Sequence, residues 1–281
     1  MKASFRFIVV FMSLSFLSFS QEKLMSTQRH LEELKKKGLQ ISTGDFNEDV
    51  DAVLKKAIDK YWNYCPVKFV SNTKLNKDQL TLLIGNYKIK SWTDYFYTKM
   101  TFVNSGWMFF EAHFDNLTAK GVNYGADKGF EQMEFKINIF VLNLAAQFKF
   151  HDSVYTKGKK KGLDQWGGYR NKLKESKILI PTDLFNHGVT KESFKDLKSA
   201  EFATAEEINK RLADNNTKGY SVLVAYTSPM GRYFNVIDLT SGDYLLFLNL
   251  GGRFQDGMTG DPKVIDDKAV KSGIETINES K

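Results

Sequence analysis

VKFVSNTKLNK (residues 67–77) and AEFATAEEINK (residues 200–210) carry one pattern of apolar, hydroxyl and polar side chains, 133 residues apart. The pattern predicts a short strand, a hydroxyl N-cap and a helix in each half of the chain. It arises either from duplication of one α/β unit or from the independent use of the same type of helix N-cap in both halves. The matched pairs are Phe69 with Phe202, Ser71 with Thr204, Leu75 with Ile208, and Asn76-Lys77 with Asn209-Lys210.

The surrounding first half predicts further helices and strands. Residues 46–62 hold a continuous apolar stripe at helical spacing, and residues 26–38 indicate a shorter helix. Residues 68–71 indicate a strand, and residues 101–115 indicate two strands joined by a turn at Asn104-Ser105-Gly106. Residues 130–150 fit the periodicity of both a helix and a strand, and we favour a helix because the stretch is too long for an ordinary strand.

The second half has clearer signals. Residues 177–180 (KILI) predict a strand that Pro181 ends. Residues 190–197 predict a short helix that Thr190 caps with Ser193 or Glu192, and Thr204 with Glu207 forms a capping box for a second helix. Strands are expected at residues 220–226, 233–239 and 244–250, and a terminal helix at residues 266–278. Short turns join the three strands, so we expect an antiparallel meander.

Together these elements predict a mixed α/β fold with two related α/β units, the second ending in an antiparallel β-meander. The basic, glycine-bearing segment TKGKKKG (residues 156–162) marks the boundary between the units. The expected organisation is a signal peptide at 1–20, an N-terminal helical segment at 21–43, a first α/β unit at 44–155, a basic linker at 156–170 and a second α/β unit at 171–281.

The first twenty residues have the three parts of a secretory signal peptide. Lys2 and Arg6 precede an apolar run at residues 7–19, and Ser18 and Ser20 suit cleavage before Gln21. We expect a periplasmic or secreted protein without a transmembrane segment in the mature chain, because no later apolar run reaches the roughly 20 residues required. Removing two positive charges from the net +7 leaves +5, which favours anionic surfaces weakly and is far from a nucleic-acid-binding signature.

Three groups of residues are candidates for chemistry or binding. Glu111, His113 and Asp115 alternate along a predicted strand, so they share a face and could hold zinc or another divalent ion; the alternative is the solvated face of a half-buried strand. A basic and aromatic patch could bind an acidic glycan, a lipid headgroup or a nucleic-acid strand, or else be a flexible linker followed by core aromatics. A glycine-rich loop with Arg253 could form an anion nest or be a plain surface loop. The patch comprises Lys159, Lys160, Lys161, Trp166, Tyr169 and Arg170.

Cys65 is the only cysteine, so an internal disulfide is excluded. It follows an apolar helix, which favours the role of a small buried hydrophobe. A nucleophile and an intermolecular disulfide remain the alternatives.

The order of a helix, KFVS (residues 68–71) and a second helix resembles small α/β units of exported bacterial envelope proteins. Examples are the N-terminal domain of TolB and the CsgG-like group of curli secretion. The resemblance covers Asp49–Leu80 and recurs more weakly at Thr190–Leu212. The chain as a whole also resembles uncharacterised exported bacterial proteins. It implies work in the cell envelope and brings no catalytic residues. No cysteine directly follows the apolar run at residues 7–19, so the chain differs in this respect from the lipoprotein members of the envelope group.

The sequence thus predicts an exported, non-enzymatic protein that binds an envelope protein or an anionic polymer, without a cofactor. The alternative is a metal-dependent hydrolase with its site at Glu111, His113 and Asp115. A third reading is a structural accessory subunit with no ligand of its own.

Overall fold

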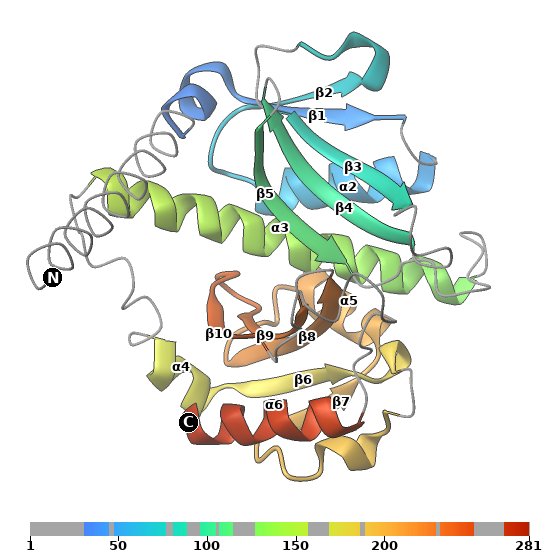
Figure 1. The fold of residues 1–281 in the computed structure, drawn as a ribbon, viewed down its shortest axis with the longest axis vertical. Helices are drawn as coiled ribbons and strands as arrows, with labels where there is room; N and C mark the ends of the chain where they lie inside the picture. Colours follow the sequence, from blue (N-terminus) through green and yellow to red (C-terminus); the bar gives the residue numbers. More distant parts are fainter. Residues whose placement is uncertain are drawn as a thin grey trace, which may run out of the picture.

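The computed structural model describes residues 31–44, 48–76, 81–88, 96–104, 107–114, 127–156, 169–185, 189–228, 231–249 and 267–280. The fold is mixed α/β, with two five-stranded sheets and the long helix α3 (Asp127–Thr156) crossing the molecule between them (Figure 1). The expected signal peptide at residues 1–20 lies outside the described residues. No helix in the described part of the chain is long and apolar enough to cross a bilayer.

The first sheet has the strand order β2-β1-β3-β4-β5. β1 pairs in parallel with both β2 and β3, and β3, β4 and β5 form an antiparallel meander. β1 occupies an inner position although it precedes residue 44, so this sheet also draws on the expected N-terminal segment. The elements are β1 (Leu39–Thr43), α2 (Glu48–Tyr61), β2 (Val67–Ser71), η1 (Asn72–Lys74), β3 (Thr81–Lys88), β4 (Phe96–Asn104) and β5 (Trp107–Phe114).

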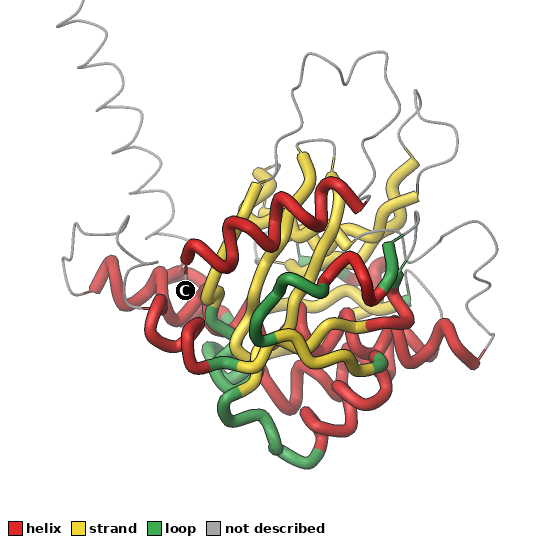
Figure 2. The backbone as a smooth tube through the Cα atoms, turned by 90° about the horizontal axis from the view of Figure 1, so that it is seen from below, coloured by secondary structure: helices red, strands yellow, loops and turns green. Residues whose placement is uncertain are grey.

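The second sheet has the order β10-β9-β8-β6-β7. β6 pairs in parallel with β7 and β8, and β8, β9 and β10 form the predicted antiparallel meander. The elements are α4 (Arg170–Glu175), β6 (Lys177–Pro181), η3 (Thr182–Leu184), η4 (Lys191–Phe194), β7 (Ala200–Ala203), α5 (Ala205–Ala213), β8 (Tyr220–Ser228), β9 (Gly231–Asp238), β10 (Tyr244–Asn249) and α6 (Asp267–Ser280). Figure 2 shows α6 crossing the outer face of this sheet.

The two sheets have the same topology, with β1 to β5 corresponding to β6 to β10 in order. The two matched phenylalanines are also in register, since Phe69 lies opposite Ile41 and Phe202 opposite Ile180. Both final hairpins contain a β-bulge at the same place. One extra residue lies opposite Phe102 in the first hairpin and one opposite Val236 in the second. A bulge fixes strand direction and twist locally, so the two meanders share more than strand order.

Three apolar cores fill the spaces between these layers. The upper core joins the first sheet to α2 and α3, the middle core joins α3 and α5 to the second sheet, and the lower core joins that sheet to α4, η4 and α6. In α3, residues 133, 137, 140, 141, 144, 145 and 148 face the upper core, and residues 135, 139 and 142 face the middle core.

The two apolar faces of α3 explain why its sequence fits two periodicities. Residues two apart in a helix point about 200° apart, since each residue turns by about 100°. Burial on opposite faces therefore places apolar residues at 133, 135, 137, 139 and 141, which is also the alternation of a strand. The helix predicted by length at residues 130–150 is confirmed and extends further at both ends.

The two segments that share the sequence pattern differ in their helix capping. Thr204 Oγ1 accepts from Glu207 N at 3.1 Å, and Glu207 Oε2 accepts from Thr204 N at 2.7 Å, so the predicted capping box of α5 is confirmed. The start of the helix predicted after Ser71 is wrong, because the described residues 72–76 make the single turn η1 and Ser71 forms no side-chain cap. Ser71 is followed at the third position by Lys74, which has no carboxylate to complete the box.

In the first unit, the side chain of the buried Gln40 binds the backbone of the segment that follows η1. The Gln40 side chain accepts from Asn76 N at 3.1 Å and donates to Asn76 O at 3.4 Å. Leu179 holds the equivalent place in β6 and packs in the middle core, together with Ala205 and Ile208 of α5. The amide of Gln40 thus binds the backbone where an apolar side chain supports a helix in the second unit.

Candidate functional site

The predicted metal site is only partly within the described residues. Glu111 and His113 lie on β5, opposite Thr101 and Lys99 of β4. They are two residues apart and therefore share one face of the strand. Asp115 lies outside the described residues. Among the side chains that the structure describes, no three His, Cys, Asp or Glu residues are grouped closely enough to hold a metal ion.

The predicted basic and aromatic patch enters the described residues only at its end. Lys159, Lys160, Lys161, Trp166 and the glycine-rich loop with Arg253 lie outside them. Tyr169 immediately precedes α4, and Arg170 is the first residue of that helix. The half-buried Tyr169 ring packs against the lower core. Burial and the nearby Asp243 raise the pKa of its phenol. Tyr169 thus helps to pack α4 on the second sheet.

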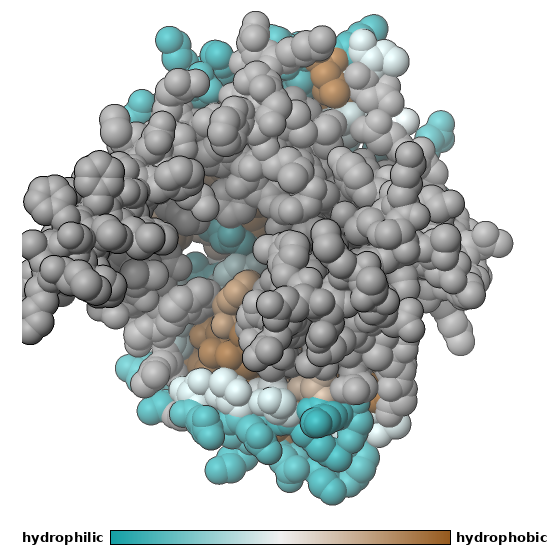
Figure 3. Space-filling model, viewed as in Figure 1, coloured by the Kyte–Doolittle hydropathy of each residue, from teal (hydrophilic) through white to brown (hydrophobic). Residues whose placement is uncertain are grey.

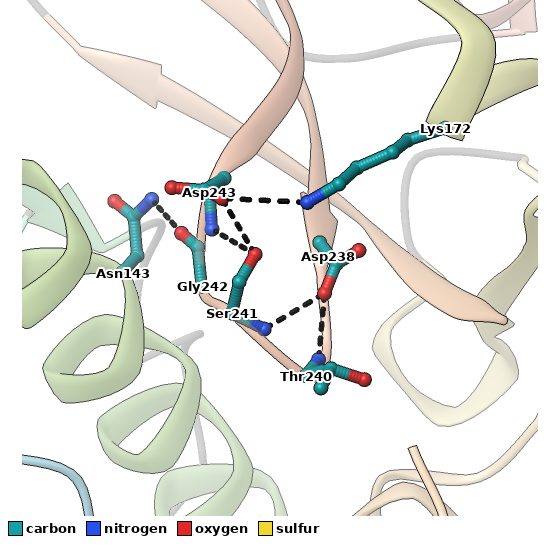
Figure 4. Close-up of polar contacts among 7 residues, drawn as sticks. All are labelled: Asn143, Lys172, Asp238, Thr240, Ser241, Gly242 and Asp243. Carbon is teal, nitrogen blue, oxygen red and sulfur yellow. Dashed lines mark hydrogen bonds and ion pairs between the residues drawn. The ribbon is translucent and has the colours of Figure 1, made fainter. Parts of the chain in front are cut away.

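The turn between β9 and β10 is held by its own side chains (Figure 4). Asp238 Oδ1 accepts from the backbone N–H groups of Thr240 and Ser241, both at 2.8 Å. Asp243 Oδ2 accepts from Ser241 Oγ at 2.7 Å and lies 3.8 Å from Lys172 Nζ of α4. Because the carboxylates bind groups of the turn and of α4, they fix where β10 begins and where α4 lies beside it.

Gly242 brings this turn onto α3. Its carbonyl oxygen accepts from Asn143 Nδ2 of α3 at 2.8 Å (Figure 4). Its φ of 78° lies in the left-handed region, and a Cβ at this position would lie 2.3 Å from the carbonyl oxygen of Leu142. Only glycine fits so close to the helix backbone. The turn therefore docks the second meander on α3.

β10 forms one end of the second sheet and presents apolar side chains on both of its faces. The bulge turns Tyr244 and Phe247 to the face that bears α3, since they lie opposite Ile237 and Asn235 of β9. Their rings make an edge-to-face contact with centroids 5.7 Å apart. The half-buried Leu246 and Leu248 face the lower core.

Phe247 is 39% exposed and is the one large exposed hydrophobic residue among the side chains that the structure describes. Figure 3 shows apolar side chains at the surface over the position of β10 in Figure 1. No charged residue occurs in the sequence of β10, YLLFLN. Among the described strands β10 pairs with β9 alone. This apolar end of the sheet, residues 244–249, is the candidate site and is termed the β10 edge.

The opposite end of the same sheet is built differently. β7 has four residues and carries Glu201, which lies 3.5 Å from Lys177 Nζ and 3.6 Å from an Arg211 guanidinium nitrogen. The Arg211 guanidinium also stacks on the Tyr220 ring, 3.9 Å from its centroid. Short length and charged side chains are the features by which proteins protect sheet edges from pairing with other strands. The β7 edge has both features.

Sequence reasoning predicted the strand at β10 but not its importance. The missed signal is a run of six residues without charge that places apolar side chains on both faces of the sheet. That signal becomes informative only when the strand is known to be terminal, because a central strand has the same composition.

Cys65 lies against the upper core and is half-buried. Trp62 Nε1 donates to its carbonyl oxygen at 3.0 Å, which fixes the chain after α2. Burial raises the pKa of the thiol from 9.0 to about 11. The thiolate is the reactive form, so this environment disfavours the alternative of a nucleophilic Cys65.

The raised pKa predicts slow alkylation of Cys65 in the folded protein. At neutral pH the thiolate fraction should be about 100-fold lower than in the unfolded chain, because the pKa rises from 9.0 to about 11. Iodoacetamide labelling rates between pH 7 and 10, with and without guanidinium, measure this. A native rate that levels off below pH 9 would contradict the assignment.

Gly242→Ala should destabilise the protein more than Gly219→Ala. Both glycines have a positive φ, but a Cβ at Gly219 meets nothing within 4 Å. Gly219→Ala should therefore cost only backbone strain, about 1–2 kcal/mol. Gly242→Ala should cost about 1–3 kcal/mol more, because it pushes the turn from α3. Urea denaturation compares the two variants, and equal losses would disprove the docking role of Gly242.

No model of a known protein family, no curated protein and no solved structure matches the chain. The resemblance to exported envelope α/β units therefore stays a prediction. In the structure its strand is β2, and the helix expected after that strand is the single turn η1.

Proposed function

We propose that the two sheets are copies of one duplicated unit. Identical strand order alone can recur in unrelated α/β folds. Three further agreements support duplication: the matching sequences 67–77 and 200–210, the equal register of Phe69 and Phe202, and the β-bulge at the same place in both meanders. Bulges persist within protein families, so the third agreement weighs most.

We propose further that the protein is an exported, non-enzymatic binding protein whose partner is a protein that contacts the apolar side chains of the β10 edge. Export rests on the leader-like sequence of residues 1–20. The single observation that supports the binding role is the contrast between the two ends of one sheet. The β7 edge is short and charged, whereas the β10 edge is longer, uncharged and bears the exposed Phe247.

An apolar surface of this kind supports binding of a protein. Exposed apolar side chains that gather at one place often mark a site of protein–protein contact. An apolar edge is a hazard for a protein that has no use for it, because it invites aggregation. A binding role explains why this edge lacks the charges that protect β7.

Two described groups with shifted pKa values lie where the two units pack together. Burial and Glu134 raise the pKa of Tyr61 to about 12, and the ring lies against the middle core. Burial lowers the pKa of Lys60, whose Nζ donates to Leu212 O at 2.6 Å and Ala213 O at 3.3 Å. Lys60 of α2 thereby caps the C-terminal end of α5 and joins the two units.

A photoreactive benzoylphenylalanine at position 247 should capture the partner in cells of the source organism. We expect one discrete adduct from Phe247→benzoylphenylalanine and none from Glu201→benzoylphenylalanine at the β7 edge. Adding Leu248→Lys should remove the adduct, since a charge desolvated at a strand interface is costly. Denaturing electrophoresis detects the adduct, and mass spectrometry identifies it. Equal yields at 247 and 201 would refute the proposal.

A metal-dependent hydrolase is the second candidate, favoured by one observation. Glu111 and His113 share a face of β5, the strand that corresponds to β10 in the first sheet. A carboxylate and an imidazole on one face suit a divalent ion if further ligands converge on them.

Metal content distinguishes the two candidates. Under the binding proposal, protein dialysed against excess zinc and then against buffer should hold no stoichiometric zinc. Elemental analysis measures this, with His113→Ala as the variant and His30→Ala as a control outside the described residues. One zinc per chain that His113→Ala removes would instead favour the hydrolase.

A further inference from the structure

We infer that one face of the first sheet binds an acidic glycan, at the place where Gly85, Lys99 and His113 form one row across β3, β4 and β5. The inference goes beyond the proposed function, because it concerns a carbohydrate on the first sheet rather than a protein at the β10 edge. It follows from the residue types that the strand register brings together on this face.

The register determines which residues lie on this face. Leu82 of β3 is buried in the upper core with α2 and α3. Successive residues of a strand lie on opposite faces of a sheet, so Gly85 lies on the face away from that core. Gly85 pairs with Lys99 of β4, and Lys99 pairs with His113 of β5. Paired residues share a face, so the whole row lies opposite the upper core.

The row of Gly85, Lys99 and His113 suits a carboxylate. Lys99 and His113 occupy directly opposite positions, whose Cβ atoms are about 4.5–5.5 Å apart in an antiparallel pair. An ammonium and an imidazole at this spacing can both donate hydrogen bonds to one carboxylate. A glycine inside a strand marks a bulge, a bend or the close approach of a ligand, and pairing of β3 with β4 is regular through Gly85.

The two flanking rows supply groups for the rest of a sugar. Thr101 and Glu111 are paired on one side, and Tyr87 and Tyr97 on the other. Hydroxyl and carboxylate oxygens accept hydrogen bonds from sugar hydroxyl groups. Tyrosine combines an apolar ring, which suits the C–H face of a sugar, with a polar end. The three rows extend over four residues of β4, about 14 Å, which suits an extended chain better than a single ion.

The same face of the second sheet has a different composition. Counted outward from the shared bulge, the equivalent row is Tyr226, Tyr233 and Asn249, which carry no charge. That face builds the middle core with α3 and α5. Charged residues are costly under an apolar layer, so the row with Lys99 does not serve the first unit as a core of this kind. The two units therefore use one face for different purposes.

Lys99 also bears on the alternative of a metal site. The hydrolase candidate places a divalent cation at Glu111 and His113, and Lys99 is directly opposite His113. An ammonium so close to a divalent cation repels it, whereas the same ammonium attracts an anion. Lys99 therefore favours an anionic ligand on this face.

Calorimetric titration of the full chain with three uronate trisaccharides tests the inference. The trisaccharides consist of galacturonate, mannuronate or guluronate, and each is compared with its methyl ester, which keeps the rings and removes the charges. Lys99→Gln is the variant and Lys68→Gln its matched control. Lys68 is exposed and lies on the same face, because it pairs with Gln40, which pairs with Thr81. Its strand β2 is separated from β4 by β1 and β3.

We expect a uronate trisaccharide to bind, and its methyl ester to bind about tenfold or more weakly, the effect of losing a charge-assisted hydrogen bond. Lys99→Gln should weaken binding of the trisaccharide by a similar factor, and Lys68→Gln by less than about twofold. Both variants remove one positive charge, so they change the general attraction for anions equally. Tyr97→Leu should weaken trisaccharide and ester alike, and thermal unfolding checks that each variant folds.

The other results overturn the inference. No binding of any of the three trisaccharides rejects the glycan. Equal losses from Lys99→Gln and Lys68→Gln show attraction by net charge alone. Equal binding of trisaccharide and ester rejects the acidic group, and binding of free acetate as tightly as the trisaccharide identifies a simple anion site instead. None of these results affects the β10 edge, which crosslinking at position 247 tests separately.

Discussion

The burial of α3 on two opposite faces is the constraint on which the rest of the structure depends. One face completes the upper core with α2, and the opposite face completes the middle core with α5 and the second sheet. Neither core can close without this helix, because each takes large side chains from it, such as Phe148 above and Phe135 below. A shared helix of this kind joins two topologically equal units into one packed body.

The shared helix also leaves the edges of the sheets as the places where function can vary. The second sheet is covered by α3 and α5 on one face and by α6 on the other, so its faces are occupied by the fold. α6 is unlike α3, because its outer side holds the exposed Lys268, Lys271 and Glu275, and no further layer packs on these described residues. In the second sheet, therefore, the terminal strands are less enclosed than the faces.

Local signals in the sequence predicted most of the helices and strands but few of the pairings between strands. The stripe at residues 46–62, the Thr204 box and the three meander strands depend on neighbours in sequence, and the structure confirms them. β1 was missed because the strand has only five residues and includes the buried polar Gln40 and Ser42. β3 was missed as well. The terminal position of β10 depends on long-range pairing, so the candidate site could not be predicted from its own residues.

The equal strand order of the two sheets places both candidate sites on the last strand of a meander. After the shared bulge, the residue opposite Thr101 in β5 is Glu111, and the residue opposite Asn235 in β10 is Phe247. One unit therefore carries a carboxylate where the other carries an exposed aromatic ring. Among the described strands, the last strand of each meander stands at one end of its sheet. A substitution at such a terminal position costs less in packing than one in a central strand, which both neighbouring strands enclose.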